Sequence, residues 1–385
     1  MIERTRAHIL VVDDDAGTLR AVQRILSKLH RVTCVSSGAE ALAQIGAGHL
    51  GAGHPDIAVV DIRMPEMNGF ALTRELRSRA GDIDVILMTG DPEEPENALV
   101  RAIDEGAFYF IQKPFDRRVL LTLVARCLEL RQLRAAQQRY VRQLEHELDE
   151  ARRFQLSLLP PRRGEGPGVS LNARYVSCSQ LAGDLYDYAA ADAGCVAFLI
   201  ADVVGHGVPA AMLTSVVKSA FRSAYTDGFE PLAVVDRVKD GIRSFDEDRF
   251  VTLCCGRLDA ASGRLRYVNA GHPPPILRRD HDQVCALDST GPMLSSAFID
   301  VRYDEMVEQL SQSDSLLLYT DGVTETHGPD ALFGAERLSS LVATSGLRGS
   351  GLLDAVLAAL DDFAASRPQQ DDVTLLNIDY HGMAD

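Results

Sequence analysis

The stretch from Leu120 to Leu159 constrains the chain most, because it has no Gly or Pro and is rich in helix-forming residues. A helix of that length is roughly 60 Å long at 1.5 Å per residue. Its apolar residues recur at steps of three and four, as in a heptad seam, with interruptions at Arg134 and Gln137. The seam residues are Leu123, Cys127, Leu130, Val141, Leu144, Leu148, Ala151 and Leu158.

A helix of this kind cannot bury its apolar stripe alone. We expect the same helix of a second copy to cover it in a coiled coil, which makes the protein a homodimer. A solvated helix, or one that packs on its own domain, is the alternative.

Chain length places a domain on each side of this helix. With 385 residues the chain is too long for one ordinary core. We expect a first domain over residues 7–125, a helical connector over 126–159 and a second domain over 168–380. Pro160 and Pro161 stop the helix, because proline lacks the N–H that a helix interior needs.

The first domain alternates short apolar runs with amphipathic stretches, which predicts an α/β doubly wound parallel sheet. The expected strands cover 8–12, 33–35, 56–61, 84–89 and 108–112, and the expected helices cover 16–29, 38–45, 69–80 and 95–106. Chemistry in such sheets lies at the carboxyl ends of the strands. The polar residues there are Asp13, Asp14, Asp61, Thr89 and Lys113.

Three carboxylates on one edge of a sheet repel one another unless a cation neutralises them. The ligands offered are all oxygen atoms, which suits Mg²⁺. A carboxylate with a hydroxyl and an ammonium group nearby can accept a phosphoryl group, because those groups and the metal offset the developing charge. For any one of these residues, a plain turn or cap at a strand end is the alternative.

The motifs VVDDD, VVDIRMPEMNG, MTG and QKPF resemble those of the response regulator receiver domain, which has a flavodoxin-like fold. The resemblance implies that Asp61 is the phosphoacceptor and that a histidine kinase or phosphotransfer protein is the donor. It also implies a Mg²⁺ site formed by Asp13, Asp14, Asp61 and the backbone carbonyl of Arg63. The implied switch residues are Thr89, Phe110 and Lys113, with a cis bond between Lys113 and Pro114.

Strands dominate the second domain, where strands and helices in blocks favour an α+β fold with two helix-covered sheets. The expected strands cover 169–176, 195–204, 250–260, 263–271, 315–325 and 373–380, and the expected helices cover 209–225, 232–245 and 349–365.

Four carboxylates fall at or beside apolar elements of this domain, namely Asp184, Asp202, Asp321 and Asp371. Each alone reads as a turn residue or a cap. Together, with no His or Cys beside them, they predict a Mg²⁺ or Mn²⁺ site with two ions that share one carboxylate. Such a pair can deprotonate a bound water and direct it at phosphorus. We expect Asp372 to support or cap this site.

The motifs AGDLYDY, ADVVGHGVPAAM, LLLYTDGVTE and QQDDVTLL resemble the PPM family of metal-dependent serine/threonine phosphatases, in its SpoIIE-like branch. The resemblance implies an αββα sandwich. It also implies that Asp202 bridges both ions with help from the Val203 carbonyl, that Asp184 binds one ion, and that Asp321 and Asp371 bind the other.

Metal-activated water would be the nucleophile in this resemblance, and the substrate would be a phosphorylated STAS-type anti-anti-sigma factor. Ala182 departs from the usual GGD motif. We interpret His206 as a surface loop residue and His272 as a folding element.

We therefore expect the protein to be a protein phosphatase whose activity is controlled by phosphorylation. A non-enzymatic adaptor with a phosphatase-like binding domain is the alternative. A DNA-binding output is opposed by the net charge of −16. The seven Cys residues include no CxxC pair, which predicts reduced thiols in the cytoplasm. We expect no signal peptide and no membrane span, because no apolar run is long enough for either.

Overall fold

The computed structural model describes residues 6–46, 54–79, 83–90, 109–191, 194–246, 248–279 and 283–383. The helix expected over 95–106 lies outside the described residues. The chain divides into two units, Met1–Gln143 and Leu144–Asp385. Within the described ranges, no helix combines the length and hydrophobicity that a membrane crossing requires.

The first unit is built on a five-stranded sheet in the order β2-β1-β3-β4-β5, in which every neighbouring pair is parallel. Its strands are β1 (His8–Val12), β2 (Arg31–Val35), β3 (Ile57–Asp61), β4 (Asp84–Thr89) and β5 (Tyr109–Gln112). The order confirms the doubly wound expectation and brings the carboxyl ends of β1, β3, β4 and β5 to one edge.

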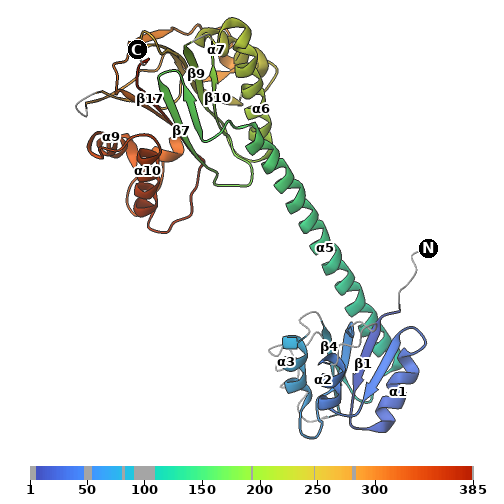
Figure 1. The fold of residues 1–385 in the computed structure, drawn as a ribbon. Coiled ribbons are helices and arrows are strands. Elements are labelled where there is room, and N and C mark those ends of the chain that lie inside the picture. Colours follow the sequence, from blue (N-terminus) through green and yellow to red (C-terminus); the bar gives the residue numbers. More distant parts are fainter. Residues whose placement is uncertain are drawn as a thin grey trace. The chain divides into compact units, whose positions relative to one another are not determined.

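Helices cover both faces of this sheet (Figure 1). α2 (Gly38–Gly46) and α3 (Gly69–Arg79) pack on one face, and α1 (Ala16–Leu26) and the start of α5 pack on the other. Asp15 is the N-cap of α1. Its side chain accepts the Thr18 N–H at 2.6 Å and so satisfies a backbone donor that the helix leaves free.

The helix α5 (Arg117–Leu158) is continuous over 42 residues and ends just before Pro160. The expected seam is only partly free for a second copy. Cys127 is fully buried in the core of the first unit together with Leu120 and Val124, so the first part of the seam packs on its own domain.

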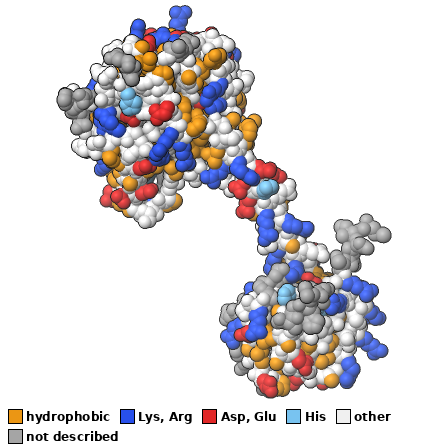
Figure 2. Space-filling model, in the orientation of Figure 1, with side chains coloured by type: hydrophobic (Ala, Val, Ile, Leu, Met, Phe, Trp, Pro, Cys, Tyr) orange, Lys and Arg blue, Asp and Glu red, His pale blue; other side chains and the backbone are white. Residues whose placement is uncertain are grey.

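The middle of the same helix exposes its apolar residues. Leu133 is 59% exposed and Tyr140 is 62% exposed, and Val141 and Leu144 are also exposed. Residues 130–144 contain no Asp or Glu, and Figure 2 shows basic side chains along the linker helix. The described residues of a single chain leave this apolar surface uncovered.

The second unit contains two six-stranded antiparallel sheets. One runs β15-β11-β10-β9-β8, with β14 on β10, and its strands are β8 (Asp184–Ala190), β9 (Cys195–Val203), β10 (Phe250–Asp259), β11 (Arg264–Ala270), β14 (Leu294–Ser295) and β15 (Met306–Gln309). The other runs β13-β12-β16-β17-β7-β6, and its strands are β6 (Arg163–Gly166), β7 (Val169–Val176), β12 (Ile276–Arg278), β13 (Val284–Ala286), β16 (Ser315–Tyr319) and β17 (Val373–Tyr380).

Helix layers enclose the two sheets and give the expected αββα sandwich (Figure 1). α6 (Val208–Ser223) and α7 (Pro231–Ile242) cover the β9–β10 sheet, and α8 (Asp321–Thr324), α9 (Gly334–Thr344) and α10 (Gly349–Ala364) cover the other. Side chains from both sheets form the core between them.

The second unit differs from the sequence expectation in several details. The strand expected over 315–325 ends at Tyr319, because Asp321 starts the short helix α8. The strand β8, the short strands β6, β12, β13, β14 and β15 and the helix α9 were not expected. β8 was hidden from the sequence pattern because two of its buried residues, Asp184 and Asp187, are acidic and have polar partners in the fold.

Candidate functional site

The polar residues predicted at the sheet edge of the first unit meet around Asp61. Asp61 ends β3 and is 5% exposed. The Nζ atom of Lys113 lies 2.5 Å from its Oδ1 and 2.6 Å from Oδ2 of Asp13. The Arg63 N–H donates to Oδ2 of Asp61 at 2.9 Å. Thr89, buried at the end of β4, accepts the Lys113 N–H with its carbonyl oxygen at 2.6 Å.

Burial raises the pKa of Asp61, and the nearby Lys113 partly offsets that effect. Burial also acts to lower the pKa of Lys113, but its hydrogen bonds to Asp13 and Asp61 outweigh burial and the pKa rises. Asp14 is exposed and lines an open hollow with Arg63 and Asn68. Asp14 thus adds an exposed carboxylate beside the buried carboxylates of Asp13 and Asp61, which the partly exposed Lys113 ammonium contacts, and this set of groups fits a Mg²⁺ ion and a phosphoryl group.

Two further expectations from the receiver resemblance concern the Lys113–Pro114 bond and Phe110 of β5. The peptide bond between Lys113 and Pro114 is cis, as predicted. Phe110 on β5 is partly buried and packs against the core that α2 and α3 share with the sheet. Its role as a switch stays a prediction.

Asp184 is a buried carboxylate of the second unit that hydrogen bonds hold in place. It opens β8 opposite Asp202 of β9 and is 2% exposed. Its Oδ2 accepts hydrogen bonds from the Thr320 hydroxyl at 2.8 Å and the Thr374 hydroxyl at 2.5 Å. Thr374 lies in β17 of the opposite sheet and Thr320 directly follows β16 of that sheet, so these bonds tie the two sheets together at the carboxylate.

Sequence reasoning missed Thr320 and Thr374. Each lies inside a predicted strand, Thr320 directly before Asp321 in the strand expected over 315–325 and Thr374 in the strand expected over 373–380. A hydroxyl within an otherwise apolar strand was the available signal, since buried hydroxyls need a partner.

Asp321 presents a free oxygen. It is the first residue of α8, and its buried Oδ1 has no hydrogen-bond partner in the described part of the chain. A buried carboxylate oxygen without a partner costs free energy unless a cation or water completes it. The neighbouring Gly322 is required, because a Cβ there would lie 2.0 Å from the Asp372 carbonyl oxygen. This close approach brings Asp321 next to the 371–372 loop.

Asp372 holds the backbone of the site, as expected for a supporting residue. Its Oδ1 accepts the Cys178 N–H at 2.9 Å, and its Oδ2 accepts the Gly183 N–H at 2.8 Å. The Asp372 N–H in turn donates to Oδ1 of Asp371 at 2.8 Å. Asp372 therefore fixes both the segment before Asp184 and the orientation of Asp371.

The four predicted ligands destabilise one another's charges. Burial first, and then Asp321 and Asp371, raise the pKa of Asp202 to about 7. Burial and Asp371 raise the pKa of Asp321 to about 6. Burial and Asp202 raise the pKa of Asp184 well above its ordinary value. A divalent cation would relieve this repulsion, so the donor set fits Mg²⁺ or Mn²⁺.

The tightest group of possible ligand atoms among the described residues is a different one. Cys178, Asp371 and Asp372 have ligand atoms within 4.8 Å of one another. Both Asp372 oxygens already accept backbone N–H groups. We therefore favour the four-carboxylate set, which is more widely spaced, as two ions that share one carboxylate allow.

Comparisons with known proteins agree with both halves of this description. Residues 9–125 match the response regulator receiver domain, and residues 192–381 match the family Stage II sporulation protein E (SpoIIE). The chain joins a receiver domain to a SpoIIE-type PPM phosphatase domain.

Individual relatives match parts of the chain. Phosphoserine phosphatase RsbP of Bacillus subtilis is 32% identical over 170 residues, which are 43% of this chain and 42% of that protein. Phosphoserine phosphatase RsbU of the same organism is 26% identical over 202 residues, 52% of this chain and 60% of that protein. The chain thus spans about half the length of these curated relatives. The SiaA-PP2C domain of Pseudomonas aeruginosa, at 21% identity and a TM-score of 0.55, has the same fold over 63% of this chain and 98% of its own.

The linker helix reaches the phosphatase site through Gln155, which sequence reasoning also missed. Gln155 is 7% exposed, and its Nε2 donates to the Ala182 carbonyl oxygen at 2.7 Å and to the Thr214 hydroxyl at 3.3 Å. The Ala182 N–H donates back to Oε1 of Gln155 at 3.1 Å. Ala182 and Gly183 lead directly into Asp184, so the helix holds the backbone that positions this carboxylate.

His272 contacts the residue that pairs with Asp202 in the phosphatase domain. It is 2% exposed, and its Nδ1 lies 2.9 Å from the hydroxyl of Thr252, the residue opposite Asp202 in the β9–β10 register. Burial lowers the pKa of His272 to about 3, so the ring is neutral at pH 7. These contacts support the folding role expected for it. His206 is exposed, as expected for a surface loop residue.

Proposed function

We propose that this protein is a phosphorylation-controlled response regulator whose output is the metal-dependent hydrolysis of phosphoserine or phosphothreonine on a partner protein. The observation that carries the proposal is a set of four acidic residues in which Asp184 faces Asp202 across paired strands and Asp321 has a buried oxygen without a hydrogen-bond partner among the described residues; burial and neighbouring carboxylates raise the pKa of all four. The similarity to RsbP and RsbU, both named phosphoserine phosphatases, supports it.

In the proposed site Asp202 with the Val203 carbonyl would hold both ions, Asp184 would hold one ion, and Asp321 and Asp371 would hold the other. The ions, Mn²⁺ or Mg²⁺, would supply a water activated for attack on phosphorus. The surrounding residues of the chain hold the proposed ligands in position. Two threonine hydroxyls hold Asp184, and Asp372 holds the backbone on both sides of the site.

In the receiver domain Asp61 is the proposed phosphoacceptor, and a histidine kinase or phosphotransfer protein is the proposed donor. Asp13, Asp14, Asp61 and the Arg63 carbonyl would hold Mg²⁺. Lys113 already pairs with Asp61 and would pair with the oxygens of an attached phosphoryl group. Thr89 and Phe110 would respond to that group.

The proposed route of control is the helix α5, which is continuous from the receiver core to Gln155. We infer that phosphorylation at Asp61 changes the pairing or register of this helix between two copies. The exposed apolar residues at its middle support a homodimer. Light scattering of the chain with and without beryllofluoride, a phosphoryl mimic, tests this. A monomer under both conditions would refute the dimer and its role.

The proposed substrate is a phosphorylated STAS-type anti-anti-sigma factor in a partner-switching pathway of the cytoplasm, as the family resemblance implies. The seven cysteines include no CxxC pair, which supports a reducing compartment. Incubation with a phosphorylated STAS protein, followed by a phosphate-affinity gel, tests the substrate directly.

The decisive experiment is phosphate release from an aryl phosphate in Mn²⁺ by the native chain and by Asp202→Ala, each with and without beryllofluoride. Metal-dependent turnover that the substitution abolishes is the expected result, and the beryllofluoride ratio gives the direction of control. No turnover, together with no metal binding to the second domain in calorimetry, would refute the enzyme and leave a non-enzymatic adaptor.

A further inference from the structure

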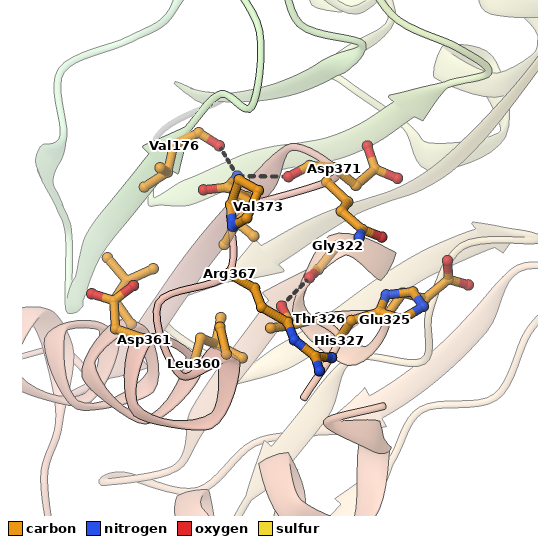
Figure 3. Close-up of a pocket in the computed structure, with 15 residues that line it drawn as sticks. Val176, Gly322, Glu325, Thr326, His327, Leu360, Asp361, Arg367, Asp371 and Val373 are labelled. Atoms are coloured by element: carbon orange, nitrogen blue, oxygen red, sulfur yellow. Dashed lines mark hydrogen bonds between the residues drawn. The ribbon is translucent and has the colours of Figure 1, made fainter. Parts of the chain in front are cut away.

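A pocket opens beside the proposed metal ligands, between α10 and the loop that carries Asp371 (Figure 3). Its volume is about 380 Å³, near the lower end of the roughly 300–1,000 Å³ typical of ligand pockets. That size suits one long side chain or a small group. Asp371 and Gly322 form the pocket wall on the side of the proposed metal ligands.

The pocket is preformed, because hydrogen bonds hold the loop above it. The Gln369 amide donates to the carbonyl oxygens of Val176 at 2.9 Å and Asp371 at 2.6 Å, and Figure 3 draws both bonds. The Arg367 guanidinium donates to the carbonyl oxygens of Gly328 and Pro329. These contacts fix the loop before any ligand binds.

The lining combines an apolar interior with acidic groups. Leu357, Leu360 and Ala364 of α10 supply apolar surface, while the exposed Glu325 and Asp361 add carboxylates. The one guanidinium among the lining residues, Arg367, already donates to two carbonyl oxygens. A side chain with an apolar stem and a cationic head complements such a pocket, and Lys and Arg have that form.

Asp371 belongs both to this pocket and to the proposed ligand set, so an occupant lies close to a phosphoryl group at the metals. We propose that the pocket is a substrate subsite that binds a Lys or Arg side chain a few residues from the phosphorylated residue of the partner protein. This inference rests on the proposed function and adds to it a basic sequence preference.

The test uses the full chain with Mn²⁺ and a panel of phosphoserine peptides. One Lys is moved from position −4 to +4 around the phosphoserine in an otherwise neutral sequence, and parallel series carry Glu or Ala instead. We expect one register of Lys to raise kcat/KM about threefold to fivefold over Ala, the range of a partly exposed ion pair with added apolar contact. Glu in that register should lower it.

Asp361→Lys is the decisive variant, because it reverses a pocket charge without touching a proposed metal ligand. It should abolish the Lys preference and favour Glu in the same register. Asp362→Lys is the matched control, since Asp362 is also exposed, is the next residue of α10 and does not line the pocket. It should behave as the native chain. Turnover of an aryl phosphate, which is too small to fill the pocket, should stay unchanged in both variants.

The outcomes separate the two levels of the proposal. Aryl phosphate turnover without a Lys preference, or a Lys preference that survives Asp361→Lys, would overturn the subsite alone. A preference lost equally in Asp362→Lys would also overturn it, because a general surface charge would then explain the effect. If neither the aryl phosphate nor any peptide is hydrolysed, the proposed function fails and the subsite fails with it.

Discussion

Gln155 of the linker helix and Ala182 of the phosphatase site exchange two hydrogen bonds, one from Nε2 to the carbonyl oxygen at 2.7 Å and one from the amide N–H to Oε1 at 3.1 Å. Ala182 lies two residues before Asp184, and both Gln155 and Ala182 are buried. A shift or rotation of the helix must therefore move this backbone segment or break the pair.

The first prediction is that Gln155→Ala separates receiver state from catalysis. The change leaves two buried backbone groups of Ala182 without partners, which costs about 1–3 kcal/mol each when such groups stay dry. We expect a lower melting temperature of the phosphatase domain and an aryl phosphate rate that no longer responds to beryllofluoride. Gln138→Ala is the control, because Gln138 is exposed on the same helix. A beryllofluoride response equal to that of the native chain would show that Gln155 does not carry the signal.

The second prediction concerns the receiver domain. Asp61→Asn should prevent labelling by acetyl phosphate with Mg²⁺ and remove any effect of beryllofluoride on aryl phosphate turnover, because the amide cannot accept the phosphoryl group. A phosphate-affinity gel measures the labelling. Asp15→Asn is a suitable control, since Asp15 is an exposed helix cap near the same edge. Labelling that persists in Asp61→Asn would place the phosphoacceptor elsewhere.

Much of the fold was predictable because its strands are apolar runs with clear boundaries. The five-stranded parallel sheet and the helix α5 follow from such patterns. β8 escaped because its buried acids hide an apolar pattern. Asp187, for example, is fully buried only because Lys218 and Arg222 pair with it at 2.6 Å. That pairing depends on α6, which is distant in sequence from β8.

The candidate sites were predictable as residue types but not as contacts. The acidic residues at strand ends identified Asp61 and Asp202, whereas Gln155 and Thr374 act through partners that the sequence does not reveal. The heptad seam shows the limit of what sequence periodicity can predict. Cys127 has the right spacing for a seam between two copies, yet it is buried in the receiver's own core. Periodicity shows that a helix face is covered but not what covers it.

The third prediction separates a supporting carboxylate from a ligand. Asp372→Asn replaces one of two oxygens that accept backbone N–H groups, and hydrogen bonds to charged groups contribute about 1.5–3 kcal/mol. We expect a lower melting temperature in EDTA. Asp321→Asn removes a charge that its neighbours repel, so in EDTA its melting temperature should equal or exceed that of the native chain, while turnover in Mn²⁺ falls about 100-fold or more.

Thermal melts of both variants in EDTA, and their aryl phosphate rates in Mn²⁺, make this comparison. The reverse pattern, with Asp321→Asn unstable and active, would exchange the roles of the two residues. It would then also be wrong to interpret the free oxygen of Asp321 as a ligand position.

The fourth prediction is that the metal-free phosphatase domain becomes less stable as the pH rises. The pKa of Asp202 is about 7 in the folded chain, against an ordinary value of 3.8. A carboxyl whose pKa is higher in the folded chain binds more protons when folded. The unfolding free energy therefore falls as the pH rises from 3.8 to about 7. Mn²⁺ binds the deprotonated carboxylates, so its stabilising effect should grow over the same range.

Melting temperatures in EDTA and in Mn²⁺ between pH 5 and 8, for the native chain and for Asp202→Asn, test this prediction. The difference between the two chains in EDTA cancels the titrating groups that do not interact with Asp202. Because the amide does not titrate, the native chain should lose stability relative to Asp202→Asn as the pH rises. In Mn²⁺ the order should reverse near the upper end, where only the native chain binds the metal fully. A difference in EDTA that stays flat with pH would mean that Asp202 has an ordinary pKa and that the four carboxylates do not form one electrostatic cluster.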